Sequence, residues 1–102
     1  MTVTVQQLND KNTVQIAISQ QFDYSLHQKF RDAYRNQQRS GTTFRINLSR
    51  ATYMDSSALG MILLLKEHAD KLTGSVVIEQ PNDAVRKILA IANFNHFVTI
   101  EG

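Results

Sequence analysis

The chain has 102 residues, a length that corresponds to one domain of ordinary size. Apolar residues make up 42% of it and charged residues 20%, which favours a folded domain over a disordered chain. Because there is no cysteine, disulfides, thiolate nucleophiles and zinc–thiolate sites are excluded. The longest apolar run, residues 61–65, is too short to span a membrane, and no charged-then-apolar leader begins the chain. We therefore expect one cytoplasmic domain of bacterial type, residues 1–102, that does not insert into a membrane.

The formal net charge of +2 does not by itself indicate a nucleic-acid partner. A local excess of positive charge does occur between residues 29 and 50, where Asp32 is the one acid among six bases: Lys29, Arg31, Arg35, Arg39, Arg45 and Arg50. Nucleic-acid binding would also require these bases on one face with aromatic residues between them for base stacking. We expect a solvated helix face instead, and no nucleic-acid partner.

Two strands are predicted at the start of the chain. Apolar and polar residues alternate in residues 2–6 and again in residues 14–19, as they do in strands that bury one face. Residues 9–12 between them, Asn-Asp-Lys-Asn, are typical of a turn. The two strands should therefore form a hairpin.

A helix follows, for which Asp23 or Ser25 is the candidate cap. Gly41 is expected to end it, shortly after Arg39, whose positive charge suits the last turn of a helix. The apolar residues with helical spacing are Leu26, Phe30, Ala33 and Tyr34.

The second half of the chain alternates strands and helices. We predict a strand at residues 44–48, a helix at about 57–72, a strand at 76–78, a helix capped by Asn82, and an edge strand at 97–100. The apolar face of the last helix comprises Val85, Ile88, Leu89 and Ala92. Because a helix connects the second and third strands, that pair should be parallel with a right-handed crossover. The order β-β-α-β-α-β-α(-β) predicts an α/β fold, a mixed four- to five-stranded sheet packed by three or more helices.

The helix at residues 57–72 is apolar nearly all round its first two turns. Such a helix is either buried at its start or carries a partner there, and we place Leu63 on the face packed against the sheet. Gly60 lowers helix propensity by about 1 kcal/mol relative to alanine. We therefore expect it to permit close packing or the close approach of a partner.

Asp55, Ser56 and Ser57 lie at the predicted strand-to-helix turn. Each of the three side chains can accept hydrogen bonds from the unpaired N–H groups of a first helical turn, but only one cap is needed. A surplus serine there could be phosphorylated. The phosphate group would carry a charge of roughly −1.5 to −2, and the fold would tolerate it because it would lie at the positive end of the helix dipole. From the spacing alone, two serines that merely support the helix start remain the alternative.

No enzymatic motif is recognisable. His27, His68 and His96 lack carboxylates or second histidines at metal-ligand spacing, so no metal site is expected. The chain has no Gly-x-Ser-x-Gly turn, no Gly-x-x-x-x-Gly-Lys-Ser/Thr loop and no Gly-x-Gly-x-x-Gly. We expect a protein that is not an enzyme, has no catalytic residues and needs no cofactor.

Residues 44–65, FRINLSRATYMDSSALGMILLL, resemble the STAS domain of anti-sigma factor antagonists. In that family a strand and a short loop ending aromatic-hydrophobic-Asp-Ser-Ser-Gly-Leu-Gly precede an apolar helix. The predicted element order also matches along the whole chain, including the region around Asp23. The resemblance implies a STAS fold and a function in partner switching.

Such proteins bind a regulator in their unphosphorylated form, often a serine kinase that also holds a sigma factor, and a PP2C-type phosphatase removes the phosphate that the kinase adds. Carried over to this sequence, the resemblance makes Ser56 the phosphoacceptor, with Ser57 as the second candidate. Asp55 and Ser57 would support the loop. The docking surface would comprise Asp23, Ser56, Ala58, Leu59 and Gly60.

The sequence departs from the family pattern at three places. Ala58 replaces the usual glycine, so the turn must form without a positive φ there. Asn47 stands where many members have aspartate, and Gln20 and Gln21 replace a glycine-containing approach to Asp23.

The regulated target could be a sigma factor or another effector. The second hypothesis is a STAS subunit docked constitutively on a larger complex, such as an ABC-type lipid transporter, with Ser56 merely capping.

Overall fold

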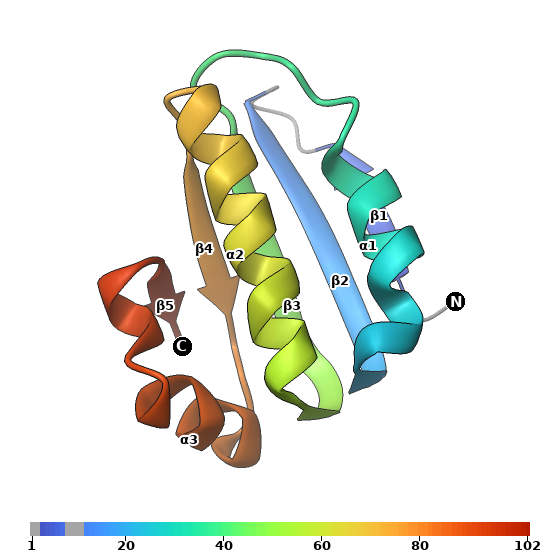
Figure 1. Ribbon diagram of the computed structural model, residues 1–102, viewed down its shortest axis with the longest axis vertical. Helices are drawn as coiled ribbons and strands as arrows, with labels where there is room; N and C mark the ends of the chain where they lie inside the picture. Colours follow the sequence, from blue (N-terminus) through green and yellow to red (C-terminus); the bar gives the residue numbers. More distant parts are fainter. Residues whose placement is uncertain (1–2, 8–11) are drawn as a thin grey trace.

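A computed structural model describes residues 3–7 and 12–102. These residues form one five-stranded sheet in the order β1-β2-β3-β4-β5, with helices α1 and α2 lying in front of it in the view of Figure 1. The elements along the chain are β1 (Val3–Gln7), β2 (Thr13–Phe22), η1 (Tyr24–Leu26), α1 (His27–Tyr34), β3 (Thr43–Met54), α2 (Ser56–Lys71), β4 (Ser75–Glu79), α3 (Asp83–Ile91), η2 (Phe94–His96) and β5 (Thr99–Glu101).

The sheet is mixed, as predicted. β1 and β2 pair antiparallel, whereas β2, β3, β4 and β5 pair parallel to one another. The predicted hairpin and the predicted parallel pairing of the second and third strands are therefore confirmed. The turn predicted for residues 9–12 falls, at residues 9–11, outside the described residues.

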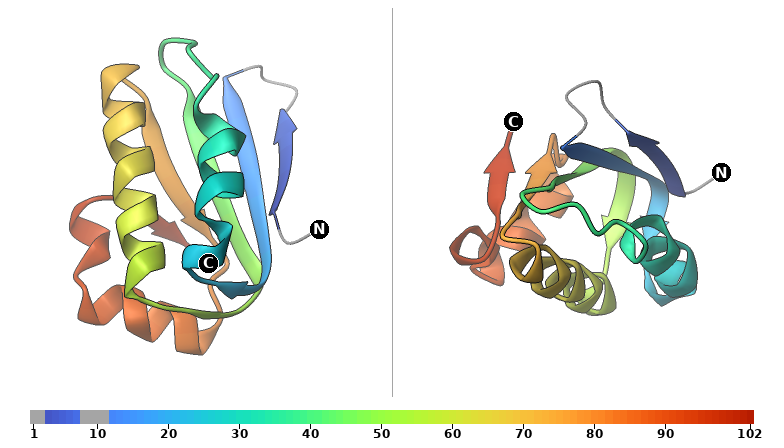
Figure 2. Two further views of the ribbon diagram at one scale, coloured as in Figure 1. Left: turned by 45° about the vertical axis from the view of Figure 1, so that its right-hand side comes forward. Right: turned by 90° about the horizontal axis from the view of Figure 1, so that it is seen from above.

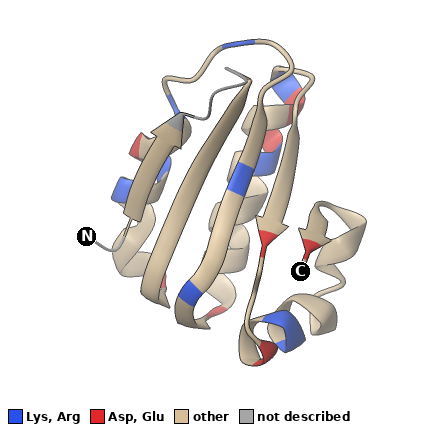
Figure 3. Ribbon diagram, turned by 180° about the vertical axis from the view of Figure 1, so that it is seen from behind, with Lys and Arg blue, Asp and Glu red and all other residues tan. Residues whose placement is uncertain are grey.

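Helices α1 and α2 cover one face of the sheet, and the other face is open (Figures 2 and 3). The strand sequences follow this arrangement, because successive side chains on a strand point to opposite faces. In β2 and β3, residues such as Ile16 and Ile46 are fully buried under the helices, while Gln15 and Arg45 on the open face are partly exposed. One-sided burial thus explains the alternation in the sequence.

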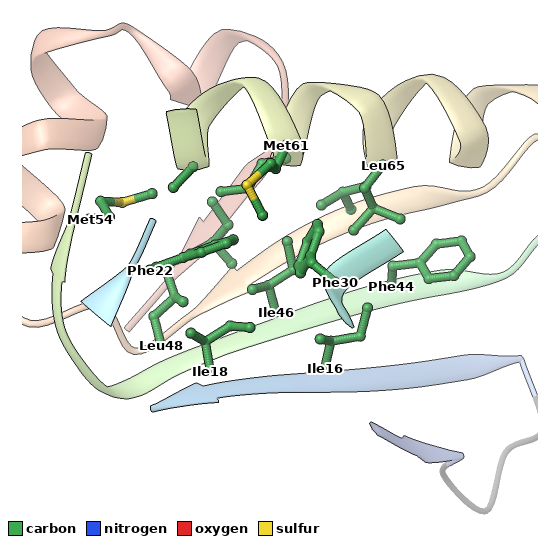
Figure 4. Close-up of a cluster of buried hydrophobic side chains, with 14 of the residues drawn as sticks. Ile16, Ile18, Phe22, Phe30, Phe44, Ile46, Leu48, Met54, Met61 and Leu65 are labelled. Carbon is green, nitrogen blue, oxygen red and sulfur yellow. The ribbon is translucent and has the colours of Figure 1, made fainter. Parts of the chain in front are cut away.

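The core lies between the sheet and the two helices (Figure 4). The ring of Phe22, at the end of β2, lies 5.2 Å from that of Phe30 on α1, and Phe30 in turn contacts Tyr34 at 5.8 Å. These rings and the surrounding aliphatic side chains anchor α1 and the end of β2. The largest fully buried side chains are Phe22, Phe30, Phe44, Ile16, Ile18, Ile46, Leu48, Met54, Ile62, Leu65, Ile78 and Leu89.

The bases between residues 29 and 50 do not share one face. The guanidinium of Arg45 lies on the open face, 3.0 Å from the carboxylate of Glu79 and 2.9 Å from that of Glu101. Hydrogen bonds to these two carboxylates raise the pKa of Arg45, and the bond to Glu101 has the larger effect. Arg35, by contrast, lies on α1 and pairs with Asp32 at 3.3 Å. The positive charge is thus divided between the two sides of the sheet.

The predicted end of the first helix is wrong. α1 ends at Tyr34, with Arg35 as its C-cap, and not near Gly41. Residues 35–40, Arg-Asn-Gln-Gln-Arg-Ser, contain no apolar residue that could pack a further turn against the sheet. Gly41 instead adopts a φ of 79° in the following connection, where its N–H donates to the carbonyl of Leu72 over 2.7 Å.

The predicted orientation of Leu63 is also wrong. The buried residues of α2 are Ala58, Met61, Ile62, Leu65 and Ala69, whereas Leu63 is 40% exposed. In a helix that is apolar all round, the residues themselves do not indicate which face packs on the sheet. Gly60 does not serve close packing either, because a Cβ atom added there would meet nothing within 4 Å. The close approach of a partner at Gly60 stays a prediction.

The remaining elements agree with the predictions except at their ends. β3 continues beyond residue 48 to Met54, because its last residues still pair with the end of β2. Asn82 caps α3, its side chain accepting from Val85 N over 2.8 Å. The predicted final edge strand exists as β5, but Phe97 lies before it in the turn after η2 and is 49% exposed.

Candidate functional site

The candidate site lies where the parallel strands β2 and β3 end. Phe22 pairs with Met54 as the last residues of these strands, and the N–H of Asp55 donates to the carbonyl of Phe22 over 3.3 Å. The turns that follow the two strands are therefore side by side. This contact brings together Asp23 and Asp55, which the sequence separates by 31 intervening residues. In α/β sheets, such carboxyl ends are the usual place for binding sites.

Asp55 is the cap of α2. Its backbone is extended, with a φ of −111°, and its Oδ1 accepts hydrogen bonds from Ala58 N over 3.1 Å and from the Ser57 hydroxyl over 2.6 Å. Of the three cap candidates in the sequence, the aspartate thus takes this position.

The same contacts act on the acidity of Asp55. The Ser57 hydroxyl, followed by the N–H groups of Ala58 and Ser57, lowers the pKa of this carboxyl, and partial desolvation opposes them. The carboxylate therefore stays ionised well below neutral pH. It holds Ser57 and the first turn of α2 in one arrangement.

Ser56 differs from Ser57 in its surroundings. Ser56 is the first residue of α2 and is exposed, and its hydroxyl has no hydrogen-bond partner among the described residues. The Ser57 hydroxyl is partly buried and bound to Asp55. Of the two serines, Ser56 therefore presents the accessible hydroxyl.

Asp23 caps the neighbouring turn. Its Oδ1 accepts from Ser25 N over 2.9 Å at the start of η1. Beside it, the 64% exposed ring of Tyr24 stacks on His27, with ring centroids 4.9 Å apart and planes 14° from parallel. Sequence reasoning missed Tyr24 and His27 as part of this surface, although exposed aromatic residues are common in protein interfaces.

A groove with a mainly apolar lining opens beside Ser56, between the start of α2 and α3. It has a volume of about 280 Å³. Tyr53, which is 50% exposed, and Ile91, which is 75% exposed, stand at its surface. Sequence reasoning missed Ile91 because it falls outside the predicted apolar face of α3, and it included Tyr53 only as the aromatic residue of the family motif. The groove is lined by Tyr53, Met54, Asp55, Ser56, Leu59, Ile88, Ile91 and Ala92.

The residues predicted as a docking surface do not all reach the surface. Ser56 and Gly60 are exposed and Leu59 lines the groove. Ala58 is fully buried against the core, so its side chain is not available to a partner and this part of the prediction is wrong. The position is helical and needs no glycine, because Ala58 is not among the residues with positive φ.

The approach to Asp23 shows how the missing glycine is accommodated. Gln20 adopts a φ of 66°, a conformation in which glycine is more favourable than other residues. The register between β2 and β3 shifts on both sides of it, between Ala17 and Ser19 and between Gln20 and Gln21. The bulged strand end is therefore kept with a glutamine in the strained position.

Other kinds of site find little support in the described part of the chain. There, no three histidine or acidic side chains come together as a metal site would require. His68 packs against the rings of Tyr34 and Phe44, and its Nε2 lies 2.8 Å from the carbonyl oxygen of Gln37. None of the helices in the described part of the chain has the length and hydropathy of a membrane-spanning helix.

Comparison with known proteins identifies the fold and the family. Residues 5–100 match the family described as Mlab, STAS domain. The chain belongs to this STAS-domain family. A curated relative, a STAS-domain containing protein of Pseudomonas aeruginosa (strain UCBPP-PA14), is 40% identical over 100 residues, which cover 98% of this chain and 99% of the relative.

Solved structures show the same STAS fold. A putative anti-sigma factor antagonist from Thermotoga maritima has a TM-score of 0.81 at 18% identity, covering 98% of this chain and 86% of the other. The unphosphorylated anti-sigma factor antagonist SpoIIAA of Bacillus has a TM-score of 0.73 at 19% identity, with coverages of 96% and 86%. A sulfate transporter family protein from Wolinella succinogenes has a TM-score of 0.77 at 11% identity, with coverages of 93% and 84%. The predicted STAS fold is confirmed, and proteins of different function share it.

Proposed function

We propose that this STAS domain is a phosphorylation-controlled partner-switching regulator and that Ser56 is its phosphoacceptor. The observation that carries the proposal is the state of the Ser56 hydroxyl. It is exposed at the first position of a 16-residue helix, and it has no hydrogen-bond partner in the part of the chain that the structure describes, since Asp55 and Ser57 bond to each other. A kinase can reach it without unfolding any element.

The position also explains why phosphorylation would change binding and leave the fold intact. A phosphate on Ser56 lies at the positive end of the α2 dipole, near N–H groups of the first turn, so the folded domain tolerates it. The same phosphate stands at the rim of the apolar groove formed with Tyr53 and Ile91. A partner that covers this groove would have to desolvate or oppose the new charge, which weakens the complex.

The partners of this switch are those that the resemblance to anti-sigma factor antagonists implies. In the unphosphorylated form the domain binds a serine kinase or anti-sigma-type regulator, or another effector, and a PP2C-type phosphatase restores this form. The domain itself contributes no catalysis. Support comes from SpoIIAA, which has the same fold and has been solved both unphosphorylated and phosphorylated, with TM-scores of 0.73 and 0.64 to this chain.

A second candidate function is a STAS subunit docked constitutively on a larger complex, such as an ABC-type lipid transporter. The observation that favours it is the occurrence of the same fold in a sulfate transporter family protein. In that case Ser56 is only the first residue of α2, and Asp55 alone has a role, as the cap.

Phosphate incorporation tests the acceptor. With the cognate kinase and ATP, Ser56→Ala should abolish nearly all incorporation, whereas Ser57→Ala should retain much of it. Of these two serines, Ser57 is bound to Asp55, whereas Ser56 has no hydrogen-bond partner among the described residues. Phosphopeptide mapping that places the modification on Ser57 would overturn the assignment.

Partner affinity, measured together with the melting temperature, tests the switch. Ser56→Ala should bind the regulator as the unmodified wild type does, while Ser56→Asp and phosphorylated protein should bind at least about tenfold more weakly. The aspartate is an imperfect substitute, since it carries one charge and lacks three phosphate oxygens. Melting temperatures should stay within a few degrees of one another. Equal affinity of all four forms would contradict the switch and favour the constitutive subunit.

A further inference from the structure

The free edge of β1 is a second surface, remote from Ser56. β1 is the first strand of the sheet and pairs with β2 alone, so its other edge is unpaired among the described residues. Its sequence, Val-Thr-Val-Gln-Gln, contains no charge and no proline. Monomeric proteins normally protect such an edge with lysine, proline, a bulge or a covering segment. The edge is therefore suited to pairing with another strand.

An apolar notch lies between this edge and α1. It has a volume of about 250 Å³ and is lined by Val3, Val5, Lys29, Asp32 and Ala33. Val3 is buried beneath the helix, but Val5, on the same face of the strand, is 49% exposed. A strand added at the edge would cover Val5 and the notch at once.

We propose that the occupant is a second copy of this chain, bound through antiparallel pairing of β1 with β1 to form a ten-stranded sheet. The two-fold axis passes beside Val5, which then lies opposite the partner's Val5, while Thr4 lies opposite the partner's Gln6. This register keeps Val5 on the helix-covered face in both copies. Directly opposite residues have Cβ atoms about 4.5–5.5 Å apart, so the two valines contact each other.

The charges at the notch favour a second copy over an unrelated strand. Lys29 has no ion pair among the described residues. Asp32 uses its Oδ1 atom for both of its contacts, an ion pair with Arg35 at 3.3 Å and a hydrogen bond from Gln28 at 3.1 Å. Neither contact involves its Oδ2 atom. Lys29 and Asp32 are three residues apart on α1, and a two-fold axis reverses the direction of the partner's helix. Each Lys29 therefore meets the partner's Asp32, and the pair forms twice, as an isologous interface requires.

The dimer leaves the Ser56 surface open. β1 forms one edge of the sheet, while α3, which borders the groove at Ser56, lies below the end of β4 in the view of Figure 1, away from β1. A dimer through β1 thus displays two separate Ser56 surfaces. The inference does not depend on the proposed switch.

Sedimentation equilibrium of the purified protein, from micromolar to near-millimolar concentration, tests the dimer. The wild type should show a monomer–dimer equilibrium, and Val5→Lys should be monomeric throughout. Leu64→Lys is the matched control, because Leu64 is 51% exposed on α2 and should leave the equilibrium unchanged. Circular dichroism spectra and melting curves verify that each variant is folded. A wild type that stays monomeric, or a Val5→Lys variant that dimerises as the wild type does, would overturn the proposal.

Charge reversal tests the proposed geometry. Lys29→Glu should raise the dimer dissociation constant about tenfold, since it sets two acids against each other at two symmetry-related places. The double variant Lys29→Glu with Asp32→Lys should return it close to the wild-type value, because the two pairs re-form with reversed signs. Dimerisation that the single variant leaves unchanged, or that the double variant fails to restore, would rule out this two-fold interface.

Discussion

Replacing the cap of α2 gives the sharpest test of how the fold prepares Ser56. Asp55→Ala removes the acceptor for Ala58 N and for the Ser57 hydroxyl. Loss of an N-cap costs about 0.5–2 kcal/mol, typically about 1. For a domain of this size, about 1 kcal/mol corresponds to a fall of roughly 4–8 °C in melting temperature. Asp55→Asn is the matched control, because its amide oxygen can still cap while the charge is lost.

The functional consequence should follow the cap. Asp55→Ala loosens the first turn of α2, so the kinase meets Ser56 in a less defined position and phosphorylates it more slowly. Asp55→Asn should keep most of the stability and most of the rate. Chemical denaturation and initial rates of phosphate incorporation measure the two effects. If Asp55→Ala were phosphorylated as fast as the wild type while being measurably destabilised, the ordered cap would not be what presents Ser56.

The lowered pKa of Asp55 adds a pH dependence with a defined sign. Since the carboxyl has a lower pKa in the folded protein than its ordinary value of 3.8, the folded state favours its ionised form. The extra stability of the wild type over Asp55→Asn should be complete above about pH 5 and should disappear as pH falls through the folded pKa. Denaturation at several pH values measures it. A stability difference that stays constant down to pH values well below about 3.8 would refute the reasoning.

Three further tests, made with five substitutions, address the packing and the backbone. Leu65→Ala, at a fully buried site, should lower the free energy of unfolding by about 2–5 kcal/mol, whereas Leu63→Ala, at a 40% exposed site, should lower it by less than about 1 kcal/mol. Equal losses in denaturant titrations would contradict the orientation of α2. Gly60→Ala should stabilise the helix by about 0.5–1 kcal/mol because its Cβ meets open space, and should weaken partner binding if the partner approaches there; a loss of stability would show that the position is crowded. Gln20→Gly should raise the melting temperature or leave it unchanged, because glycine adopts the positive φ of this position without strain. Gln21→Gly should lower the melting temperature, because Gln21 has no positive φ. If Gln20→Gly lowered it and Gln21→Gly did not, Gln20 would not be strained.

Features that depend on neighbouring residues could be predicted from the sequence. Alternation in β2 and β3 predicted half-buried strands, and the helix between them predicted their parallel pairing. Polar residues at Asn82 and at the Asp55 turn marked helix starts because a side-chain oxygen there satisfies N–H groups only a few residues away. These interactions are local, so their residues lie close together in the sequence.

Features that depend on contacts between distant segments could not be predicted in this way. The uniformly apolar start of α2 did not reveal that Leu63 faces outward, because the sheet selects the packed face. The contact between Phe22 and Asp55 places the two turns together. The apolar groove beside Ser56 exists because the end of β3 and α3 meet there, and no local spacing in either segment encodes that meeting. Burial and accessibility are properties of the assembled layers, so only the folded chain shows which serine hydroxyl is left free.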